Sequence, residues 1–565
     1  MAKVRRQHGE QLERAEQTVA VAPPPPIAGW RHALAIAGLA IALGAVYFCT
    51  LQRGVSRGDS AELQYLSPLL GICHPPGYAI EILFGYLASL MPFGPDVAYR
   101  LNALMAVCGI VGCLALYGTV RRTTGLILPG LVAAGLLGFS SIYWSYSTVA
   151  EEYVFHGAFL LIGAYAAVRF VSADRAAWLW VAAITVGIST AGRPSELLVL
   201  PAFLGLWFGR RRSARLGVRR LGVAVALYLV PLVFSIGYFL VRDNPRYVHA
   251  RDGILADEIV GRVPTSSLTG WPRLKEAAYY TLGLSWAKHD ASWKDRLETG
   301  ASRYANLLGG TEVISPQKHA NDPFALDRGG GAAIGLPGLV LAVAGIIFRR
   351  RQYGWVLLGL GLFVGNFIFF IWHQTWDALT FTVPGLAGLA LLGGLGAAGP
   401  PQGSSVGVVA GVARRAARWR AVGLAVGGLT VAGLAVGNYR LVNRSQMTDQ
   451  AMAARLVAAM RELPRDSVML TTFWPAMTFR YSAYVGAGRT DIRTLAIEDK
   501  YWTQALAYAR EHGLAAFVID TSRPGQPGRD AIRARTPRAA LEAGLVQVVY
   551  PPAAVGQPPQ DESKR

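Results

Sequence analysis

The chain contains little charge, few acidic residues and few cysteines. Only 16% of its 565 residues are charged and 52% are hydrophobic, which is not the composition of an ordinary soluble protein. The four cysteines lie in or beside apolar segments, and their spacing is not that of metal ligands. We interpret them as small apolar packing residues and do not expect a Cys49–Cys73 disulfide. No internal repeat is evident, although many secondary transporters are built from repeats. The sequence therefore predicts a membrane protein without a cysteine-based metal site.

Long apolar runs are abundant. A helix needs ~20 apolar residues to cross ~30 Å of hydrocarbon. Eleven segments are predicted to be transmembrane helices: 31–51, 97–120, 125–143, 153–171, 176–192, 195–209, 221–241, 331–348, 353–371, 379–398 and 421–438. The segments 176–192 and 195–209 are short, and only Arg193 and Pro194 separate them. The expected fold is an α-helical polytopic membrane protein.

The net charge of +20 is distributed unevenly along the chain. Basic residues gather at the N-terminus and in alternate short loops: Lys3, Arg5, Arg6, Arg121, Arg122, Arg175, Arg210, Arg211, Arg212, Arg215, Arg219, Arg220, Arg349, Arg350, Arg351, Arg414, Arg415, Arg418 and Arg420. This positive-inside pattern predicts a cytosolic N-terminus and an extracytoplasmic C-terminus, and it accounts for the charge without nucleic acid. The first span is too long for a signal-peptide core and lacks a convincing cleavage site, so we expect a retained anchor. The Ala/Arg/Gly-rich composition suggests a bacterial protein, and therefore a bacterial inner or plasma membrane.

The composition changes at both ends of the membrane region. The predicted units are a disordered cytosolic arm (1–26), a transmembrane domain (27–438) with outer loops 52–96 and 242–330, an extracytoplasmic domain (440–550) and a disordered tail (551–565). Within 440–550, predicted helices (447–463, 501–511) alternate with predicted strands (467–472, 515–520). That alternation favours a small α/β domain. In the second outer loop, 272–284 is predicted to be helical.

The first outer loop carries the candidate catalytic acids. Asp59 and Glu62 are three residues apart and share one face if the stretch is helical. They suit a general base with an orienting partner, a metal site or solvated loop charges. After Pro75 and Pro76, the apolar segment 76–91 is too short to span. It is predicted to be an interfacial helix, whose N-terminus either binds phosphate or simply lies on the membrane.

Other polar residues fall on the same predicted side. Glu151 begins a span, and Arg193 and Arg100 stand where the positive-inside bias disfavours them, which suits an anion partner; Glu196 is the plainer partner for Arg193. His373 and Asp377 lie between Trp372 and Trp376, as in a sugar site or an aromatic belt.

These motifs, taken in order, resemble a known family. They are Gly58-Asp59-Ser60-Ala61-Glu62, His74-Pro75-Pro76-Gly77-Tyr78, Pro92-Phe93-Gly94, Arg100-Leu101-Asn102, Trp144 with Ala150-Glu151-Glu152-Tyr153, and Asp377 with Phe381 and Pro384. The chain resembles C-type integral-membrane glycosyltransferases of a former domain-of-unknown-function family that includes a vertebrate protein O-mannosyltransferase acting on plexin-type receptors. It departs from that pattern at Glu152, at Ala191-Gly192-Arg193-Pro194 and in the second outer loop, which has only Asp243-Asn244-Pro245.

The resemblance implies a reaction and roles for residues. A polyprenyl-phosphate-linked sugar, mannose in the first instance, passes to an acceptor hydroxyl of a protein or glycan at the outer face, with inversion. Asp59 is then the general base, assisted by Glu62 and Glu151. Substrate-binding roles fall to His74, Tyr78, Arg100, Arg193, His373 and Asp377. No cofactor is expected, and a divalent cation stays open.

Two other functions compete with this one. A lipid-linked sugar flippase or transporter predicts ionisable residues at mid-membrane, whereas the acids here gather at one face. A non-enzymatic membrane sensor predicts an outer ligand-binding domain but gives no reason for Asp59 and Glu151 at loop–helix junctions.

Overall fold

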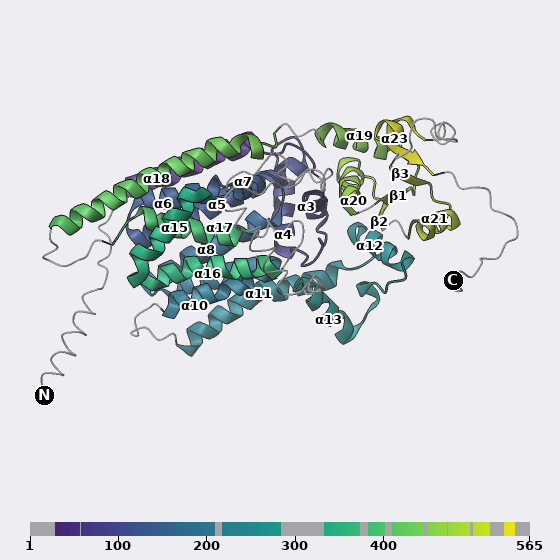
Figure 1. The fold of residues 1–565 in the computed structure, drawn as a ribbon. Coiled ribbons are helices and arrows are strands. Elements are labelled where there is room, and N and C mark those ends of the chain that lie inside the picture. Colours follow the sequence, from purple (N-terminus) through teal and green to yellow (C-terminus); the bar gives the residue numbers. More distant parts are fainter. Residues whose placement is uncertain are drawn as a thin grey trace, which may run out of the picture.

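The computed structural model describes residues 29–56, 58–208, 217–283, 333–372, 382–401, 410–445, 449–471, 473–497, 501–519 and 536–548. The predicted arm 1–26, the tail 551–565, His373 and Asp377 lie outside the described residues. Figure 1 shows a helical bundle at one end of an elongated molecule and a smaller unit containing a four-stranded sheet at the other.

Helices occupy all eleven predicted spans in the described residues. They are α2 (Gly29–Thr50), α5 (Val97–Thr124), α6 (Ile127–Gly138), α8 (Glu152–Ala173), α9 (Ala176–Gly192), η1 (Pro194–Val199) with α10 (Leu200–Phe208), α11 (Val218–Arg242), α15 (Gly335–Arg349), α16 (Tyr353–Trp372), α17 (Val383–Ala397) and α18 (Ala410–Val442). Six are long and apolar enough to cross a membrane: α2, α5, α8, α11, α16 and α18. The other five are shorter, and their crossing stays a prediction.

The predicted span 125–143 is two helices. Helix α6 ends at Gly138, and α7 (Ser141–Tyr146) begins after Ser140, whose hydroxyl accepts the Tyr143 N–H at 3.3 Å. A serine that satisfies a free N–H favours a new helix start, and the apolar pattern alone could not reveal it.

Helix α17 lies at the centre of the bundle. All 15 of its residues are buried, which its glycines permit. A Cβ on Gly396 would stand 1.9 Å from the Leu341 carbonyl oxygen of α15, and one on Gly388 would stand 2.5 Å from the Gly359 oxygen of α16. Glycine contacts of this kind let helix backbones approach closely.

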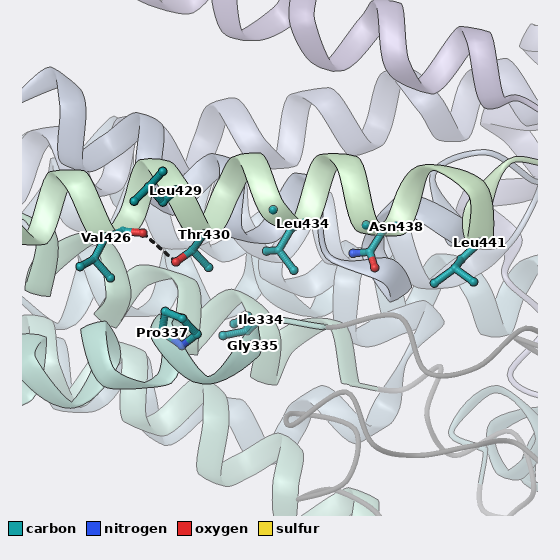
Figure 2. Close-up of a pocket in the computed structure, with 11 residues that line it drawn as sticks. Ile334, Gly335, Pro337, Val426, Leu429, Thr430, Leu434, Asn438 and Leu441 are labelled. Carbon is teal, nitrogen blue, oxygen red and sulfur yellow. Dashed lines mark hydrogen bonds between the residues drawn. The ribbon is translucent and has the colours of Figure 1, made fainter.

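An apolar groove of about 580 Å³ runs along the bundle between α18 and the start of α15 (Figure 2). Ile334, Pro337 and Leu434 line it, together with Asn438, whose amide donates to the Phe139 carbonyl at 2.8 Å. Among the described residues, no acidic side chain lines the groove.

Two short helices lie between the bundle and the smaller unit: α3 (Gly58–Leu69) and α4 (Ala79–Ser89) (Figure 1). Helix α4 corresponds to the predicted helix 76–91, but it begins at Ala79, three residues after the predicted start. Gly77 (φ 94°) and Tyr78 (φ 47°) adopt left-handed backbone conformations that do not continue a right-handed helix.

The C-terminal unit combines helices with a mixed sheet. Its elements are α19 (Asp449–Glu462), β1 (Val468–Thr471), α20 (Phe473–Arg480), η6 (Tyr481–Gly486), β2 (Arg493–Ala496), α21 (Trp502–Glu511), β3 (Ala516–Ile519), α23 (Arg538–Glu542) and β4 (Leu545–Gln547). The strand order is β2-β1-β3-β4; β1 pairs in parallel with β2 and β3, and β4 is antiparallel to β3. From the second outer loop, α12 (Val248–Ile259) packs on β2, and α13 (Gly270–Thr281) packs on α11.

The smaller unit packs against α3. Tyr65 and Leu66 of α3 share one apolar cluster with Met460, Met477 and Tyr484. The α3 helix is thereby held between two bodies, and its acidic residues lie at their junction.

Candidate active site

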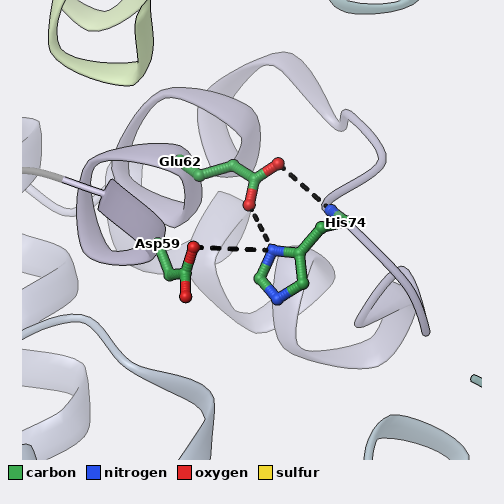
Figure 3. Close-up of side chains that lie close together, drawn as sticks. All are labelled: Asp59, Glu62 and His74. Atoms are coloured by element: carbon green, nitrogen blue, oxygen red, sulfur yellow. Dashed lines mark hydrogen bonds and ion pairs between the residues drawn. The ribbon is translucent and has the colours of Figure 1, made fainter. Parts of the chain in front are cut away.

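The first two turns of α3 place two carboxylates around one imidazole (Figure 3). Glu62 accepts twice from His74: Oε2 lies 2.5 Å from Nδ1, and Oε1 lies 3.1 Å from the backbone N–H. Asp59 Oδ1 lies 3.8 Å from the same Nδ1. The i, i+3 spacing thus brings both acids to the loop that carries the His-Pro-Pro motif.

The two carboxylates hold His74 in its charged form. Burial disfavours the imidazolium, but Asp59 and Glu62 outweigh burial and raise the pKa of His74 from 6.5 to about 10. At neutral pH the ring is therefore a cation. The Asp59 side chain is 21% exposed and that of Glu62 only 6%, so Asp59 is the more accessible acid to an incoming substrate.

Glu151 joins the cluster from the bundle side. It occupies the N-cap position of α8 and accepts a hydrogen bond from the Ser60 hydroxyl of α3. It is 3% exposed, and burial together with Glu152 and Asp59 raises its pKa well above 4.5. A neutral carboxylic acid here can donate a hydrogen bond as well as accept one.

A second, buried layer lies behind these acids, and the sequence analysis missed it. The Tyr78 hydroxyl donates to Glu152 Oε1 at 3.3 Å, and its ring centroid lies 5.9 Å from that of His156. His156 Nε2 lies 3.3 Å from Glu81 Oε2, and both side chains are 1% exposed.

The signal for this layer was present in the sequence. Glu81 stands in an otherwise apolar helix and His156 in a predicted span, and ionisable residues in such runs are candidates for function. His156 lies inside the predicted span 153–171 and could have been singled out on that ground.

The two candidate arginines occupy different places. Arg193 follows α9, is 3% exposed, and its guanidinium carbon lies 4.8 Å from the Tyr153 ring centroid, one residue beyond Glu152. Arg100 instead donates to the carbonyls of Ser89 and, at 3.0 Å, of Phe93, beyond the C-terminal end of α4. The structure therefore brings Arg193 to the acidic layer and leaves Arg100 at the far end of α4.

Asp59, Glu62 and His74 also offer a cation three ligand atoms within 4.8 Å of one another. Metal–ligand bonds of ~2.0–2.2 Å generally hold two ligands of one ion ~3 Å or more apart. The 2.5 Å contact between His74 and Glu62 is thus a hydrogen bond, and an ion would have to open it. The donor set suits a divalent cation only after that rearrangement.

The site falls within a segment that matches a family of membrane mannosyltransferases. Residues 59–216 match the model described as the protein O-mannosyl-transferase TMEM260 N-terminal domain. That segment contains every candidate residue of the site that the structure describes, and the match confirms the resemblance seen in the sequence.

Two curated relatives are protein O-mannosyl-transferases named TMEM260. The mouse protein is 31% identical over 223 residues, which are 37% of this chain and 32% of the relative. The Dictyostelium discoideum protein is 26% identical over 204 residues, 33% of this chain and 25% of the relative. The chain thus spans about a third or less of the curated relatives it matches.

Solved membrane transferases are similar at low identity. The Archaeoglobus fulgidus oligosaccharyltransferase, in complex with Zn and sulfate, gives a TM-score of 0.48 at 10% identity, covering 86% of this chain and 68% of that one. ArnT from Cupriavidus metallidurans bound to undecaprenyl phosphate gives 0.39 at 13% identity, covering 94% and 99%. The Saccharomyces cerevisiae protein O-mannosyltransferase Pmt1–Pmt2 complex bound to the sugar donor gives 0.31 at 14% identity, covering 39% and 34%.

Proposed function

We propose that the chain is a membrane glycosyltransferase that moves a sugar, mannose in the first instance, from a polyprenyl-phosphate donor to an acceptor hydroxyl. The observation that carries the proposal is the Asp59–His74–Glu62 cluster, which lies inside the segment matching the O-mannosyltransferase family. Transfer takes place at the predicted outer face and inverts the anomeric centre.

Asp59 is the proposed general base. An acceptor hydroxyl must lose a proton as it attacks the anomeric carbon, and a positioned carboxylate within hydrogen-bond reach can take it. Asp59 is the more exposed of the two α3 acids, and the His74 cation beside it favours its charged form.

Glu62 and His74 act as positioning residues. The two hydrogen bonds between them fix the loop that precedes α4 and hold the imidazolium next to Asp59. Glu151, held by Ser60, is placed to bind a sugar or acceptor hydroxyl, because its carboxyl oxygens can accept hydrogen bonds.

Arg193 is the proposed partner of the leaving phosphate. The lipid phosphate gains charge as the sugar departs, and a fixed guanidinium stabilises that charge. The observation that supports this role is that Arg193 is buried beside Tyr153 and the acidic layer. Tyr78 and His74 would line the donor, whereas roles for Arg100, His373 and Asp377 stay predictions. The outer loops and the C-terminal unit would recognise the acceptor.

Transfer of radiolabelled mannose from polyprenyl-phosphate-mannose, in membranes containing wild type or Asp59→Asn, tests the proposal. We expect transfer by wild type and a loss of about 10²–10⁴-fold in Asp59→Asn, the usual contribution of a general base. Glu511→Gln, an exposed acid of α21, is the matched control and should retain full activity. Equal transfer by Asp59→Asn would show that Asp59 is not the base, and transfer only from another sugar donor would replace mannose in the proposal.

A further inference from the structure

A pocket with three arginines in its lining lies at the opposite end of the bundle from the acidic cluster. It encloses about 320 Å³ between α2, α5 and α8. Its lining residue Arg169 stands 17 positions after Glu152 on α8, or about 25 Å further along the helix axis. The pocket is therefore separate from the proposed transferase site.

The charge of this pocket is strongly positive. Arg121 and Arg122, in the last turn of α5, line it together with Arg169. Among the residues that the structure describes, no ion pair joins any of these three arginines to a carboxylate. Clustered guanidinium groups repel one another, so the arrangement favours an anionic ligand.

The guanidinium of Arg169 is already oriented. Its Nη1 donates to the Tyr165 hydroxyl at 3.0 Å, and its carbon lies 4.4 Å from the Trp178 ring centroid. Gly118 lets the Tyr165 ring lie against α5, since a Cβ there would stand 2.8 Å from it. The planar group is thus held in place with donors to spare, an arrangement that suits a phosphate.

The remaining walls contain further donors and an apolar side. His32 Nδ1 and the Tyr117 hydroxyl lie 2.9 Å apart at the α2–α5 contact. Ile36, Val111 and Leu114 extend the pocket toward the bundle middle with apolar surface. The arginines at the opening suit the headgroup of a lipid, and the apolar wall below them suits its acyl chains. Binding pockets of ~300 Å³ are large enough for a headgroup.

We propose that this pocket binds the phosphate of an anionic membrane lipid. The arginines lie near the ends of α5 and α8, two helices long enough to span the membrane, which is headgroup depth. The positive-inside pattern predicts that this end faces the cytosolic leaflet, where basic pockets between spans recognise anionic headgroups. The proposal does not depend on the transferase activity.

Thermal unfolding of the purified full chain in detergent, with added lipid, tests the site. We expect phosphatidylglycerol to raise the unfolding temperature of wild type more than phosphatidylcholine does. In Arg121→Gln/Arg169→Gln the difference between the two lipids should fall by at least half. The single variant Arg175→Gln is the matched control, because Arg175 is exposed on the same side and does not line the pocket; it should keep the wild-type response.

A further variant and a soluble phosphate complete the test. Tyr165→Phe removes only the hydroxyl that holds Arg169, so it should weaken the lipid response even if the double variant fails to fold. Glycerol phosphate should not reproduce the stabilisation; if it does so at equal concentration, the ligand is a soluble phosphate and the lipid assignment is wrong. A response that Tyr165→Phe and Arg175→Gln retain equally would overturn the site itself.

Discussion

At the scale of single residues, the charged state of His74 ties the acidic helix to its neighbouring loop. Its folded-state pKa is raised from 6.5 to about 10 by Asp59 and Glu62, against the opposing effect of burial. A group whose pKa rises on folding contributes stability that is fully present below pH 6.5 and is lost as the pH rises through about 10.

We therefore expect His74→Gln to change the pH dependence of unfolding. The stability difference between wild type and variant should be largest near pH 6 and should shrink steadily toward pH 10, close to the folded-state pKa. Unfolding temperatures measured from pH 6 to 10 check this. A difference that does not vary with pH would mean that the imidazole is neutral in the folded protein.

The glutamates of the site should respond differently to amide substitution. Because Glu62 bonds to a cationic ring, Glu62→Gln should cost about 1.5–3 kcal/mol of stability at neutral pH. Burial and the neighbouring carboxylates of Glu152 and Asp59 raise the pKa of Glu151 and disfavour its charged form, so Glu151→Gln should cost less. Denaturant titration of both variants at pH 7 measures the contrast, and equal losses would contradict the expected difference between the two glutamates.

At the scale of elements, a glycine at the end of α9 allows the close contact between α8 and α9 beside the site. Gly192 ends α9, and a Cβ there would stand 1.9 Å from the His156 ring. The resemblance marked Ala191-Gly192-Arg193-Pro194 as a departure from the family pattern. In the structure, Gly192 of this segment leaves the space that the His156 ring occupies.

Gly192→Ala should therefore displace His156 from Glu81. Overpacking a buried contact usually costs about 1–3 kcal/mol, and we expect a loss in that range. Gly428→Ala in α18 is the control, since nothing lies within 4 Å of a Cβ at that position. Unfolding temperatures of the two variants give the comparison, and similar values would show that the His156 ring moves aside freely.

How far the sequence predicts these elements depends on the kind of signal. Apolar runs located the bundle helices, and alternating patterns located α19, β1, α21 and β3. Spacing predicted that Asp59 and Glu62 share a face, and both reach His74. Glu81 and His156 could not be paired from sequence, because their contact joins separate helices. The late start of α4 depends on backbone conformations at Gly77 and Tyr78 that no residue pattern specified.

At the scale of the whole molecule, a buried ionic network joins the second outer loop to the C-terminal unit. Asp252 of α12 is fully buried, accepts from the Thr494 N–H at 2.8 Å and from the Tyr484 hydroxyl, and lies 3.9 Å from Arg480. Arg480 in turn donates to the Tyr65 hydroxyl of α3 at 3.2 Å. The network therefore reaches the helix that carries Asp59.

Asp252→Asn should destabilise the protein by about 3–5 kcal/mol, because it leaves the Arg480 charge buried without its counter-ion. We also expect the proposed sugar transfer to fall in this variant as α3 loosens. Arg510→Gln, an exposed change in α21, should leave both properties unaltered. Chemical denaturation with a parallel transfer assay tests this. A wild-type free energy of unfolding for Asp252→Asn would show that the Asp252–Arg480 pair does not stabilise the protein.

The sandwiching of α3 has a consequence for biosynthesis. Thr478 donates to the Ser56 carbonyl at 3.2 Å across 422 residues of chain, and Tyr481 reaches the Ala98 N–H across 383. At a synthesis rate of ~5–20 residues per second, the segment around α3 waits roughly 20–80 s for these partners. The nascent membrane portion thus leaves the ribosome with its acidic helix uncovered on one side, and the C-terminal unit covers that side once it has been made.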